Sequence, residues 1–300
     1  MFEVQKEDSP EINDERVFRK IYLEDTALSL ILGRNDLRGK FFLRKNLNPL
    51  KCCVYQIEGC ELHIVDHKKR DAKKVERMFS GIASRYDLLN HLLSLGLDIG
   101  WRKRVAKETG KIGCRRILDV CTGTGDTAIE LCRFWSGKAQ VDAVDFSREL
   151  IEIGRKKAKK ANMDERVTFR EGNAERLPYR DGQFDALTIT FGLRNISDRP
   201  KALKEFCRVT RAGGCFICLE FSQPTNRFFK GLYSFYLMKL VPLVSRVVGS
   251  DPAAYKYLGN TIQDFPSPFE LIRLIESAGW KEVTHQRLAG GIVAIHRAVK

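Results

Sequence analysis

The sequence lacks any run approaching the roughly 20 consecutive apolar residues that a membrane-spanning helix needs. It also lacks a targeting pattern at its start. Six acidic side chains lie within residues 1–15, whereas a signal peptide begins with basic and then apolar residues and a transit peptide is poor in acids. These absences predict a cytoplasmic protein.

Cysteine is present but not in a pattern that predicts disulfides or metal binding. The nine cysteines are scattered and odd in number, which is typical of reduced thiols in the cytosol. Cys215 and Cys218 lie in an apolar run, and an offset of three places them on opposite faces of a strand. Cys52 and Cys53, with Cys60, have no second ligand pair at zinc spacing. We therefore predict no metal site.

The basic charge of the chain is unevenly distributed. The net charge is +14 from 52 basic and 38 acidic residues, and residues 1–66 hold 10 basic and 12 acidic ones, which leaves 42 against 26 for the remainder. No nucleic-acid-binding motif accompanies this charge, so no nucleic acid partner is expected. The basic cluster at 155–160 is interpreted as a solvated helix face, with contact to lipid head groups as the alternative.

The chain divides into two parts at about residue 66. Residues 1–66 carry no sustained apolar period and no motif, and we expect an extension of unknown role that is either irregular or poorly ordered. Residues 67–300 alternate between helical and strand patterns, which indicates a parallel α/β sheet. An apolar stripe predicts a first helix from Val75 to Gly96, and a second helix begins near Asp98.

Later elements follow from the same patterns. Strands are predicted at 115–120, 139–144, 166–171, 184–190, 215–221, 281–288 and 291–299. Helices are predicted at 124–135, 147–161, 198–211 and 268–279, and Gly213-Gly214 is interpreted as the stop of the third of these. The predicted fold is a Rossmann-like, mostly parallel seven-stranded sheet with helices on both faces and an antiparallel C-terminal edge pair.

One stretch, residues 117–126, reads as a buried strand that turns into a helix. Gly123 and Gly125 allow a ligand to approach the main chain closely, and the helix start offers free N–H groups. Asp145 follows at the end of the next apolar run, where a ribose-binding acid belongs. A nicotinamide site, an S-adenosylmethionine site and a plain strand-to-helix turn all remain open at this point.

A strongly apolar helical pattern over residues 226–248 interrupts the alternation and contains Pro242. It predicts either a core helix kinked at the proline or a hydrophobic lid that faces the substrate or a membrane surface.

Several polar segments follow the predicted strands in an order typical of one enzyme class. Residues 170–174, 184–195 and 205–214 together resemble a class I S-adenosylmethionine-dependent methyltransferase. More specific motifs are Phe79-x-x-Ile-Ala-x-Arg-Tyr-Asp-Leu-Leu-Asn90, Leu118-Asp-Val-x-x-Gly-Thr-Gly-Asp126, Phe191-Gly-Leu-Arg-Asn195, Leu219-Glu-Phe-Ser222, Tyr255-Lys-Tyr-Leu-Gly259 and Gly291-Ile-Val-Ala-Ile-His-Arg297. They resemble the ubiquinone/menaquinone biosynthesis C-methyltransferase family over residues 70–300.

The resemblance implies S-adenosyl-L-methionine as the cofactor. Thr124, with Gly123 and Gly125 beside it, would contact the methionine portion. Asp119 would face the ammonium group, and its alternative is an acid satisfied by N–H groups of the loop. Asp98 stands where some relatives have histidine, so no role of that histidine is carried over.

The remaining cofactor contacts implied by the resemblance come from three other strand ends. Asp145 would bind the ribose hydroxyls. Asn173 and Ala174 would lie at the adenine, and Thr190 would line the cofactor site from the fourth strand. Ala212 departs from the family, which usually has proline before the paired glycines.

The implied reaction is methylation of a ring carbon of a polyprenylated quinol, a demethylmenaquinol or a related benzoquinol. Arg194 would stabilise the ionised quinol, and Asn195 would hold a quinol oxygen or a water. Tyr86 and His91 are candidates for proton handling. The alternatives are an ion pair of Arg194 with Asp198, a core position for Tyr86 and a plain polar role for His91.

The expected partners are the quinol and, through the apolar segment, the cytoplasmic face of the inner membrane. Assembly into a homodimer is left open. Competing functions are a nicotinamide-dependent oxidoreductase, a methyltransferase of another small lipophilic substrate, and a binding module that has lost catalysis.

Overall fold

The computed structural model describes residues 18–23, 26–31, 56–57, 60–61, 91, 94, 96–110, 113–224, 226, 231, 233, 235, 236 and 252–300. The chain separates into two compact units, Met1–Lys68 and Lys69–Lys300. Most of the predicted first helix, Val75 to Gly96, and most of residues 226–248 lie outside the described residues, so the structure leaves those two predictions open.

The first unit contains two short antiparallel pairs of strands. β1 (Phe18–Leu23) pairs with β2 (Thr26–Ile31), and β3 (Gln56–Ile57) pairs with β4 (Cys60–Glu61). The sequence did not predict these strands.

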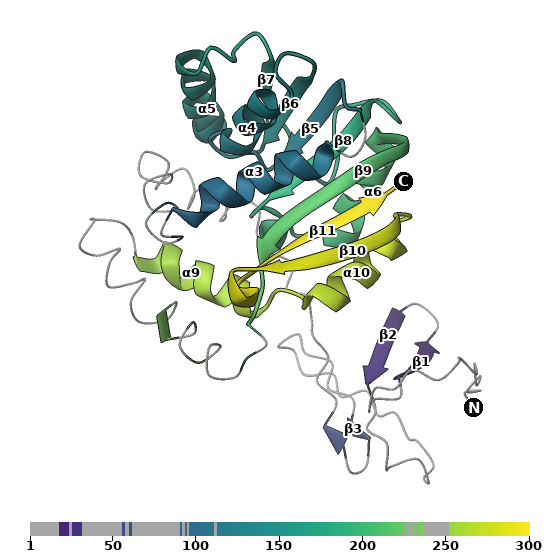
Figure 1. Cartoon of the computed structure of the whole chain (residues 1–300). Coiled ribbons are helices and arrows are strands. Elements are labelled where there is room, and N and C mark those ends of the chain that lie inside the picture. Colours follow the sequence, from purple (N-terminus) through teal and green to yellow (C-terminus); the bar gives the residue numbers. More distant parts are fainter. Residues whose placement is uncertain are drawn as a thin grey trace. The chain divides into compact units, whose positions relative to one another are not determined.

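The second unit is built on one seven-stranded sheet with the order β10-β11-β9-β8-β5-β6-β7 (Figure 1). The strands are β5 (Arg116–Val120), β6 (Gln140–Asp145), β7 (Val167–Glu171), β8 (Phe184–Thr190), β9 (Thr210–Phe221), β10 (Lys281–Leu288) and β11 (Val293–Val299). Strands β5 to β9 run parallel, whereas β11 pairs antiparallel with both β9 and β10. The predicted mostly parallel sheet with an antiparallel C-terminal pair is confirmed.

Helices cover both faces of this sheet (Figure 1). They are α3 (Leu97–Thr109), α4 (Asp126–Phe134), α5 (Arg148–Lys160), α6 (Arg199–Val209), α9 (Pro252–Gln263) and α10 (Pro268–Ser277), with 3-10 turns η2 (Leu193–Asn195) and η4 (Ala289–Gly291). Ile117 of β5 packs in a cluster with α3, α4 and α5, while its neighbour Leu118 packs in a second cluster with α6 and α10. Successive strand residues point to opposite faces, so burial on both sides explains why β5 is apolar throughout its centre.

Three helices begin at residues that the sequence marks as caps. The side chain of Ser147 accepts a hydrogen bond from the main chain of α5, and Asp198 does the same for α6. Ser267 and Glu270 form a reciprocal capping box at the start of α10. Such side chains satisfy N–H groups that have no partner inside the helix, which fixes where each helix starts.

The predicted stop of α6 is wrong. The helix ends at Val209 rather than at residue 211, and Thr210 is already extended. Gly213-Gly214 lies inside β9, at a shift of register against β8. Main-chain hydrogen bonds of 3.0 Å join both glycines to Lys300, so the glycine pair shapes a bulge that receives the C-terminal residue.

Cys215 and Cys218 are free and buried, and they belong to the clusters on opposite faces of the sheet, as predicted. The helix α9 was not predicted as an element, although the sequence motif at 255–259 falls within it.

Candidate functional site

Four polar side chains lie at or beside the carboxyl ends of neighbouring parallel strands. They are Asp119 of β5, Asp145 of β6, Thr190 of β8 and Glu220 of β9. The three acids are almost fully buried, with exposed fractions of 1%, 4% and 1% respectively. Ligands of open α/β sheets bind outside this edge, so the structure brings the predicted acids together where a cofactor would sit.

Asp145 holds the glycine loop against the start of α5. Its carboxylate accepts hydrogen bonds from the main-chain N–H of Gly123 at 2.8 Å and from that of Ser147 at 3.0 Å. Burial raises the pKa of Asp145 to about 6, although these N–H groups act in the opposite direction. Gly125 has a positive φ of 80°, and a Cβ there would lie 2.7 Å from the ring of Phe169, so this position requires glycine.

Asp119 is held by two hydroxyl groups. Thr122 and Thr188 each donate a hydrogen bond of 2.6 Å to its carboxylate. The acid is therefore satisfied by hydroxyls, and not by the loop N–H groups that the sequence offered as the alternative. Burial raises the pKa of Asp119 to about 6, against the lowering effect of these two hydroxyls.

His91 is positioned by the first turn of α3. Its Nδ1 lies 2.8 and 2.9 Å from the two carboxylate oxygens of Asp98. Ser94 and Arg102 donate to the same carboxylate. Burial alone would raise the pKa of Asp98, but hydrogen bonds from these three residues lower it to about 2. Asp98 is therefore an anion at neutral pH, and its carboxylate fixes the position of His91.

This polar chain continues to the glycine loop. The guanidinium of Arg102 lies 3.8 Å from a carboxylate oxygen of Asp126, the first residue of α4. Lys157 of α5 forms an ion pair with Asp126 and donates to the hydroxyl of Thr124 at 3.1 Å. Three elements that surround the loop are therefore tied by charge, and this fixes the position of Thr124.

Arg194 forms a buried ion pair with Glu220. Its Nη1 donates to Glu220 Oε1 at 2.7 Å and to the carbonyl of Phe191, and its main-chain N–H donates to Glu220 Oε2 at 3.1 Å. The guanidinium also lies 5.1 Å from the centre of the Phe221 ring. The proposed alternative pair with Asp198 is wrong, because Asp198 caps α6 instead.

Asn195 follows Arg194 in the turn η2 and contacts α9. Its Oδ1 accepts a hydrogen bond of 3.3 Å from the hydroxyl of Tyr257. The amide group of Asn195 therefore still has donor capacity. Tyr86 lies outside the described residues, and its predicted role stays a prediction.

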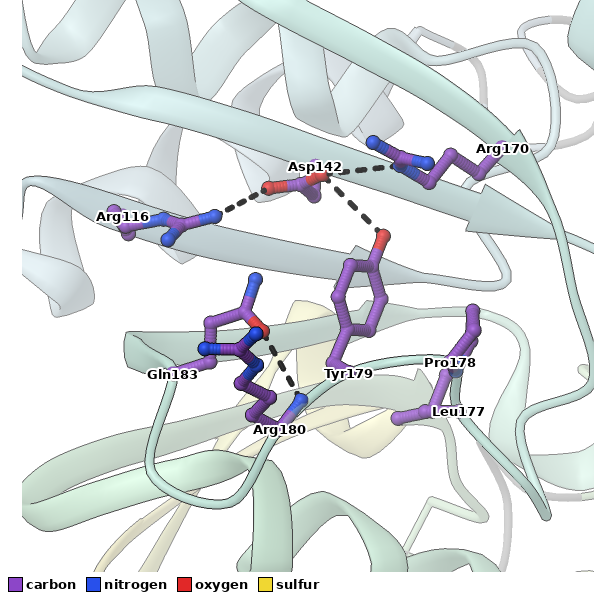
Figure 2. Close-up of a pocket in the computed structure, with 8 residues that line it drawn as sticks. All are labelled: Arg116, Asp142, Arg170, Leu177, Pro178, Tyr179, Arg180 and Gln183. Carbon is purple, nitrogen blue, oxygen red and sulfur yellow. Dashed lines mark hydrogen bonds and ion pairs between the residues drawn. The ribbon is translucent and has the colours of Figure 1, made fainter.

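A surface pocket of about 440 Å³ lies elsewhere, on one face of β5, β6 and β7. Asp142 lies at its centre, 3.7 Å from the guanidinium of Arg116, 3.6 Å from that of Arg170 and 3.4 Å from the hydroxyl of Tyr179 (Figure 2). None of the residues lining this pocket is among the predicted site residues. The pocket is therefore separate from the strand ends described above.

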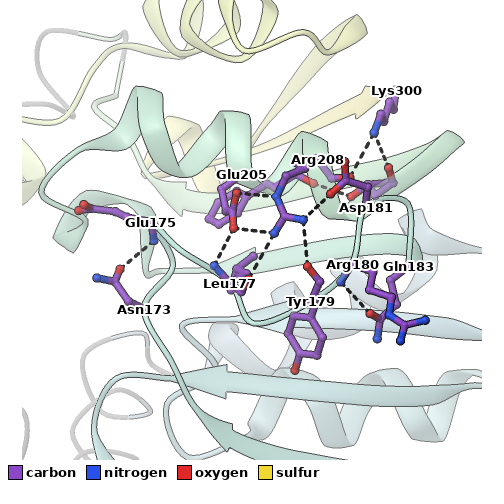
Figure 3. Close-up of polar contacts among 12 residues, drawn as sticks. Asn173, Glu175, Leu177, Tyr179, Arg180, Asp181, Gln183, Glu205, Arg208 and Lys300 are labelled. Atoms are coloured by element: carbon purple, nitrogen blue, oxygen red, sulfur yellow. Dashed lines mark hydrogen bonds and ion pairs between the residues drawn. The ribbon is translucent and has the colours of Figure 1, made fainter.

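Asn173 and Ala174 lie on the segment between β7 and β8. The Oδ1 atom of Asn173 accepts the main-chain N–H of Glu175 at 2.8 Å, and the main-chain N–H of Leu177 donates to Glu205 of α6 at 2.7 Å (Figure 3). Asn173 is exposed and Ala174 is half-buried. The segment is held in place by α6, and the side-chain oxygen of Asn173 is used within the segment.

Sequence reasoning gave no role to two residues that shape this site. Glu220 lies at the end of an apolar strand, as Asp119 and Asp145 do. The same pattern could therefore have predicted Glu220 as a site residue. Gly192 is a steric requirement, because a Cβ there would lie 2.4 Å from the Cβ of Cys121. No pattern in the sequence points to that contact.

The residues present fit a ligand that carries an ammonium group and hydroxyls. Neither Asp119 nor Asp145 forms an ion pair within the described part of the chain, although a buried acid is stabilised by a cation. The hydroxyl of Thr190 is also buried, with no hydrogen-bond partner among the described residues. A bound cofactor could supply a cation to these acids and a hydrogen-bond partner to the Thr190 hydroxyl.

A family model described as the ubiE/COQ5 methyltransferase family matches residues 67–300. The chain belongs to this family. The match begins just after the segment without motifs and runs to the last residue, so it contains every predicted site residue of the ubiE/COQ5 methyltransferase.

Named relatives agree with this membership. The chain is 42% identical over 228 residues to "Ubiquinone/menaquinone biosynthesis C-methyltransferase UbiE" of Geobacter sp. (strain M21), which covers 76% of this chain and 97% of the relative. It is 43% identical over 231 residues to "Demethylmenaquinone methyltransferase" of Mycobacterium sp. (strain KMS), covering 77% of this chain and 96% of the relative.

Solved structures show the fold alone. An S-adenosylmethionine-dependent methyltransferase from Aquifex aeolicus has a TM-score of 0.50 at 20% identity and covers 76% of this chain and 97% of its own. The [4+2]-cyclase SpnF has a TM-score of 0.56 at 17% identity and covers 78% and 98%. Because a cyclase shares the fold, the ubiE/COQ5 assignment depends on the sequence relatives and not on the architecture.

Proposed function

We propose that this protein transfers a methyl group from S-adenosyl-L-methionine to a ring carbon of a polyprenylated quinol. The substrate is a demethylmenaquinol, and a 2-polyprenyl-6-methoxy-1,4-benzoquinol is the second candidate. The observation that carries this proposal is the family match over residues 67–300, together with relatives named as quinone-biosynthesis C-methyltransferases.

The acids at the strand ends hold the cofactor in this proposal. Asp119 binds its ammonium group, Asp145 binds the ribose hydroxyls, and Thr124 lies beside the methionine portion between Gly123 and Gly125. When bound, S-adenosylmethionine supplies an electrophilic methyl group. Both acids have a pKa raised to about 6 by burial, and a bound cation favours their charged form.

The adenine is recognised by the segment after β7 and by β8. Asn173 keeps its amide nitrogen as a donor because its oxygen is already used by the main chain of Glu175. Ala174 lies beside it without adding polar groups, and the unpartnered hydroxyl of Thr190 faces the cofactor from β8. These three assignments follow the family resemblance.

The quinol is activated by ionisation. A neutral quinol carbon is a weak nucleophile, and loss of a phenolic proton, with a pKa near 10 as for tyrosine, places charge on the carbon next to the phenol oxygen. Arg194 is assigned the stabilisation of the resulting quinolate. Its Nε is buried without a partner among the described residues. Glu220 fixes the orientation of the guanidinium, and Asn195 holds a quinol oxygen or a water.

Proton handling is assigned to His91 and Tyr86. The phenolic proton leaves before methyl transfer, and the methylated ring carbon afterwards loses its hydrogen as a proton, which restores the aromatic ring. His91 is partly exposed, with 39% of its side chain accessible, and it is oriented by Asp98. Its second ring nitrogen, Nε2, is the atom that would exchange a proton with solvent or substrate.

Residues 67–300 form the catalytic domain, and residues 1–66 form an extension. In support, the relatives are covered over 96–97% of their length by 76–77% of this chain. We therefore expect a chain that starts at residue 67, where the family match begins, to retain methyl transfer.

The substrate's apolar tail makes a peripheral membrane contact part of the proposal. No helix in the described part of the chain is both long and apolar enough to cross a membrane. Phe235 is 55% exposed, and Leu97 and Ile99 at the start of α3 are 51% and 50% exposed. Polar substitutions at these positions should weaken association with liposomes that mimic the cytoplasmic face of the inner membrane.

Two measurements test the proposed function. Calorimetric titration should detect binding of S-adenosylmethionine and not of NAD, and the opposite result would favour a nicotinamide-dependent oxidoreductase. Transfer of a radiolabelled methyl group to a panel of demethylated quinols, reduced in situ, should then label the naphthoquinol. Labelling of an unrelated lipophilic phenol alone would reassign the substrate.

A further inference from the structure

Buried polar atoms without hydrogen bonds occur at Arg194 itself and in the described part of the chain that follows Glu220. Among the described residues, the Nε of Arg194, the hydroxyl of Ser222 and the hydroxyl of Tyr233 are covered from solvent and have no partner. The exposed fractions of these residues are only 5%, 5% and 8%. Buried polar groups in native proteins nearly always have a partner, so these atoms indicate a ligand.

Among these three residues, Tyr233 has a hydroxyl that can donate a hydrogen bond to a phenolate oxygen. It lies in the segment after β9, and the charges of Arg194 and Glu220 both act on its hydroxyl. These two groups form an ion pair at 2.7 Å, and their effects on the pKa of Tyr233 are opposite. Among the described groups, only Tyr236 joins them in acting on this hydroxyl.

The Tyr233 hydroxyl stays protonated at physiological pH. Burial raises its pKa above the ordinary tyrosine value, the nearby Arg194 lowers it, and Tyr236 and Glu220 raise it further. A phenol that keeps its proton is a hydrogen-bond donor and not a base. A donor shielded from water also interacts more strongly with a developing negative charge than a donor in solvent.

We propose that the hydroxyl of Tyr233 donates a hydrogen bond to an oxygen of the quinol ring and so stabilises the quinolate beside Arg194. This inference rests on the proposed function and adds a substrate-binding residue to it. Tyr233 keeps its own proton throughout, and the quinol proton passes to solvent through the groups assigned to proton handling, His91 and Tyr86.

The neighbouring Tyr236 provides a matched control. The two rings stack with their centres 6.4 Å apart and an angle of 18° between them. Tyr236 is half-buried rather than buried, and its hydroxyl is not among the buried atoms without a partner. Removing either hydroxyl leaves the stacked rings in place, so the two variants differ in which hydroxyl is lost.

The experiment compares Tyr233→Phe with Tyr236→Phe and the wild type. Turnover, KM for the quinol, the dissociation constant for S-adenosylmethionine and the pH dependence of kcat are measured with demethylmenaquinol reduced in situ. In Tyr233→Phe we expect kcat to fall by roughly 10- to 100-fold, at or below the lower end of the roughly 100- to 1000-fold effect of losing one oxyanion-hole donor. Cofactor affinity should change less than about twofold, because the proposed hydrogen bond is made to the quinol and not to S-adenosylmethionine.

The pH profile separates substrate contact from a structural role. A lost donor no longer stabilises the quinolate, so the rising limb of kcat should move to higher pH in Tyr233→Phe. Tyr236→Phe should keep the wild-type limb. A wild-type kcat and profile in Tyr233→Phe, or equal changes in both variants, would overturn the proposal.

A second variant guards against misfolding. Should Tyr233→Phe lose cofactor binding, fluorotyrosine placed at position 233 keeps the ring and hydroxyl but makes the phenol more acidic. The proposal then requires a shift of the kcat profile, and an unshifted profile overturns it. A wild-type protein that binds the cofactor yet methylates no quinol would instead refute the proposed function itself, and with it this inference.

Discussion

The carboxylate of Asp145 accepts a hydrogen bond of 2.8 Å from the main-chain N–H of Gly123, which lies 22 residues earlier in the chain. This contact joins the end of β6 to the turn that follows β5. It means that one acid both shapes the glycine loop and, in the proposed function, binds the ribose of the cofactor.

Asp145→Asn should therefore weaken both cofactor binding and the fold. An amide has one acceptor oxygen, so one of the N–H groups of Gly123 and Ser147 would face another donor. A buried donor left without a partner costs about 1–3 kcal/mol, and we expect affinity for S-adenosylmethionine to fall at least about tenfold. Calorimetric titration measures the first effect and urea unfolding the second. Wild-type affinity in a destabilised variant would assign Asp145 a purely structural role.

Asp119 and Asp145 should make the stability of the unliganded protein depend on pH. Burial raises both folded-state pKa values from 3.8 to about 6, so the folded chain holds these protons more tightly than the unfolded chain. Stability contributed by these groups is then highest below the unfolded pKa, falls as pH rises through the window between the two values, and is lost above about 6. Asp119→Asn, which can still hydrogen-bond to Thr122 and Thr188, should reduce this slope. Urea unfolding across the window measures it, and an unchanged slope in the variant would contradict the assignment.

Gly192→Ala should displace the turn that carries Arg194. The new Cβ would lie 2.4 Å from the Cβ of Cys121, closer than nonbonded carbon atoms approach. Overpacking of this kind typically lowers the free energy of unfolding by about 1–3 kcal/mol. We also expect kcat to fall, because the displaced turn carries Arg194. Gly231→Ala is the matched control, because nothing lies within 4 Å of its added Cβ. Equal midpoints of thermal unfolding in the two variants would argue against the contact.

The buried pair of Arg194 and Glu220 predicts a non-additive pair of substitutions. Arg194→Met leaves Glu220, which is 1% exposed, without its cation, and breaking a buried pair in this way costs about 3–5 kcal/mol. Adding Glu220→Gln should recover most of this stability, because the unpaired charge is gone. Activity should not return if Arg194 stabilises the quinolate. A double variant that is both stable and active at saturating cofactor would remove that role.

The sequence allowed the fold and much of the candidate site to be predicted because strand ends are marked locally. Asp119 and Asp145 each end an apolar run, and parallel strands bring such ends to one edge of a sheet. The glycine turn after β5 is likewise a local signal. These predictions needed only the order of the elements and no knowledge of distant contacts.

The features that escaped prediction depend on pairing between distant segments. Glu220 lies 26 residues from Arg194. No local pattern in the sequence indicates Glu220 rather than the nearer Asp198 as the ion-pair partner of Arg194. The glycine pair at 213–214 has the local pattern of a helix stop. In the structure it instead forms main-chain hydrogen bonds with Lys300. In both cases the prediction followed a local sequence pattern, whereas the observed contact forms between segments that are distant in the sequence.

The most direct test of this account is the fate of a methyl group from S-adenosylmethionine labelled with deuterium. The wild-type protein is incubated with this cofactor and demethylmenaquinol, and the product is analysed by mass spectrometry and NMR. The account predicts that the deuterated methyl group appears intact on a ring carbon of the naphthoquinol. A label attached to a quinol oxygen, or no label in the quinol while the cofactor binds, would contradict it.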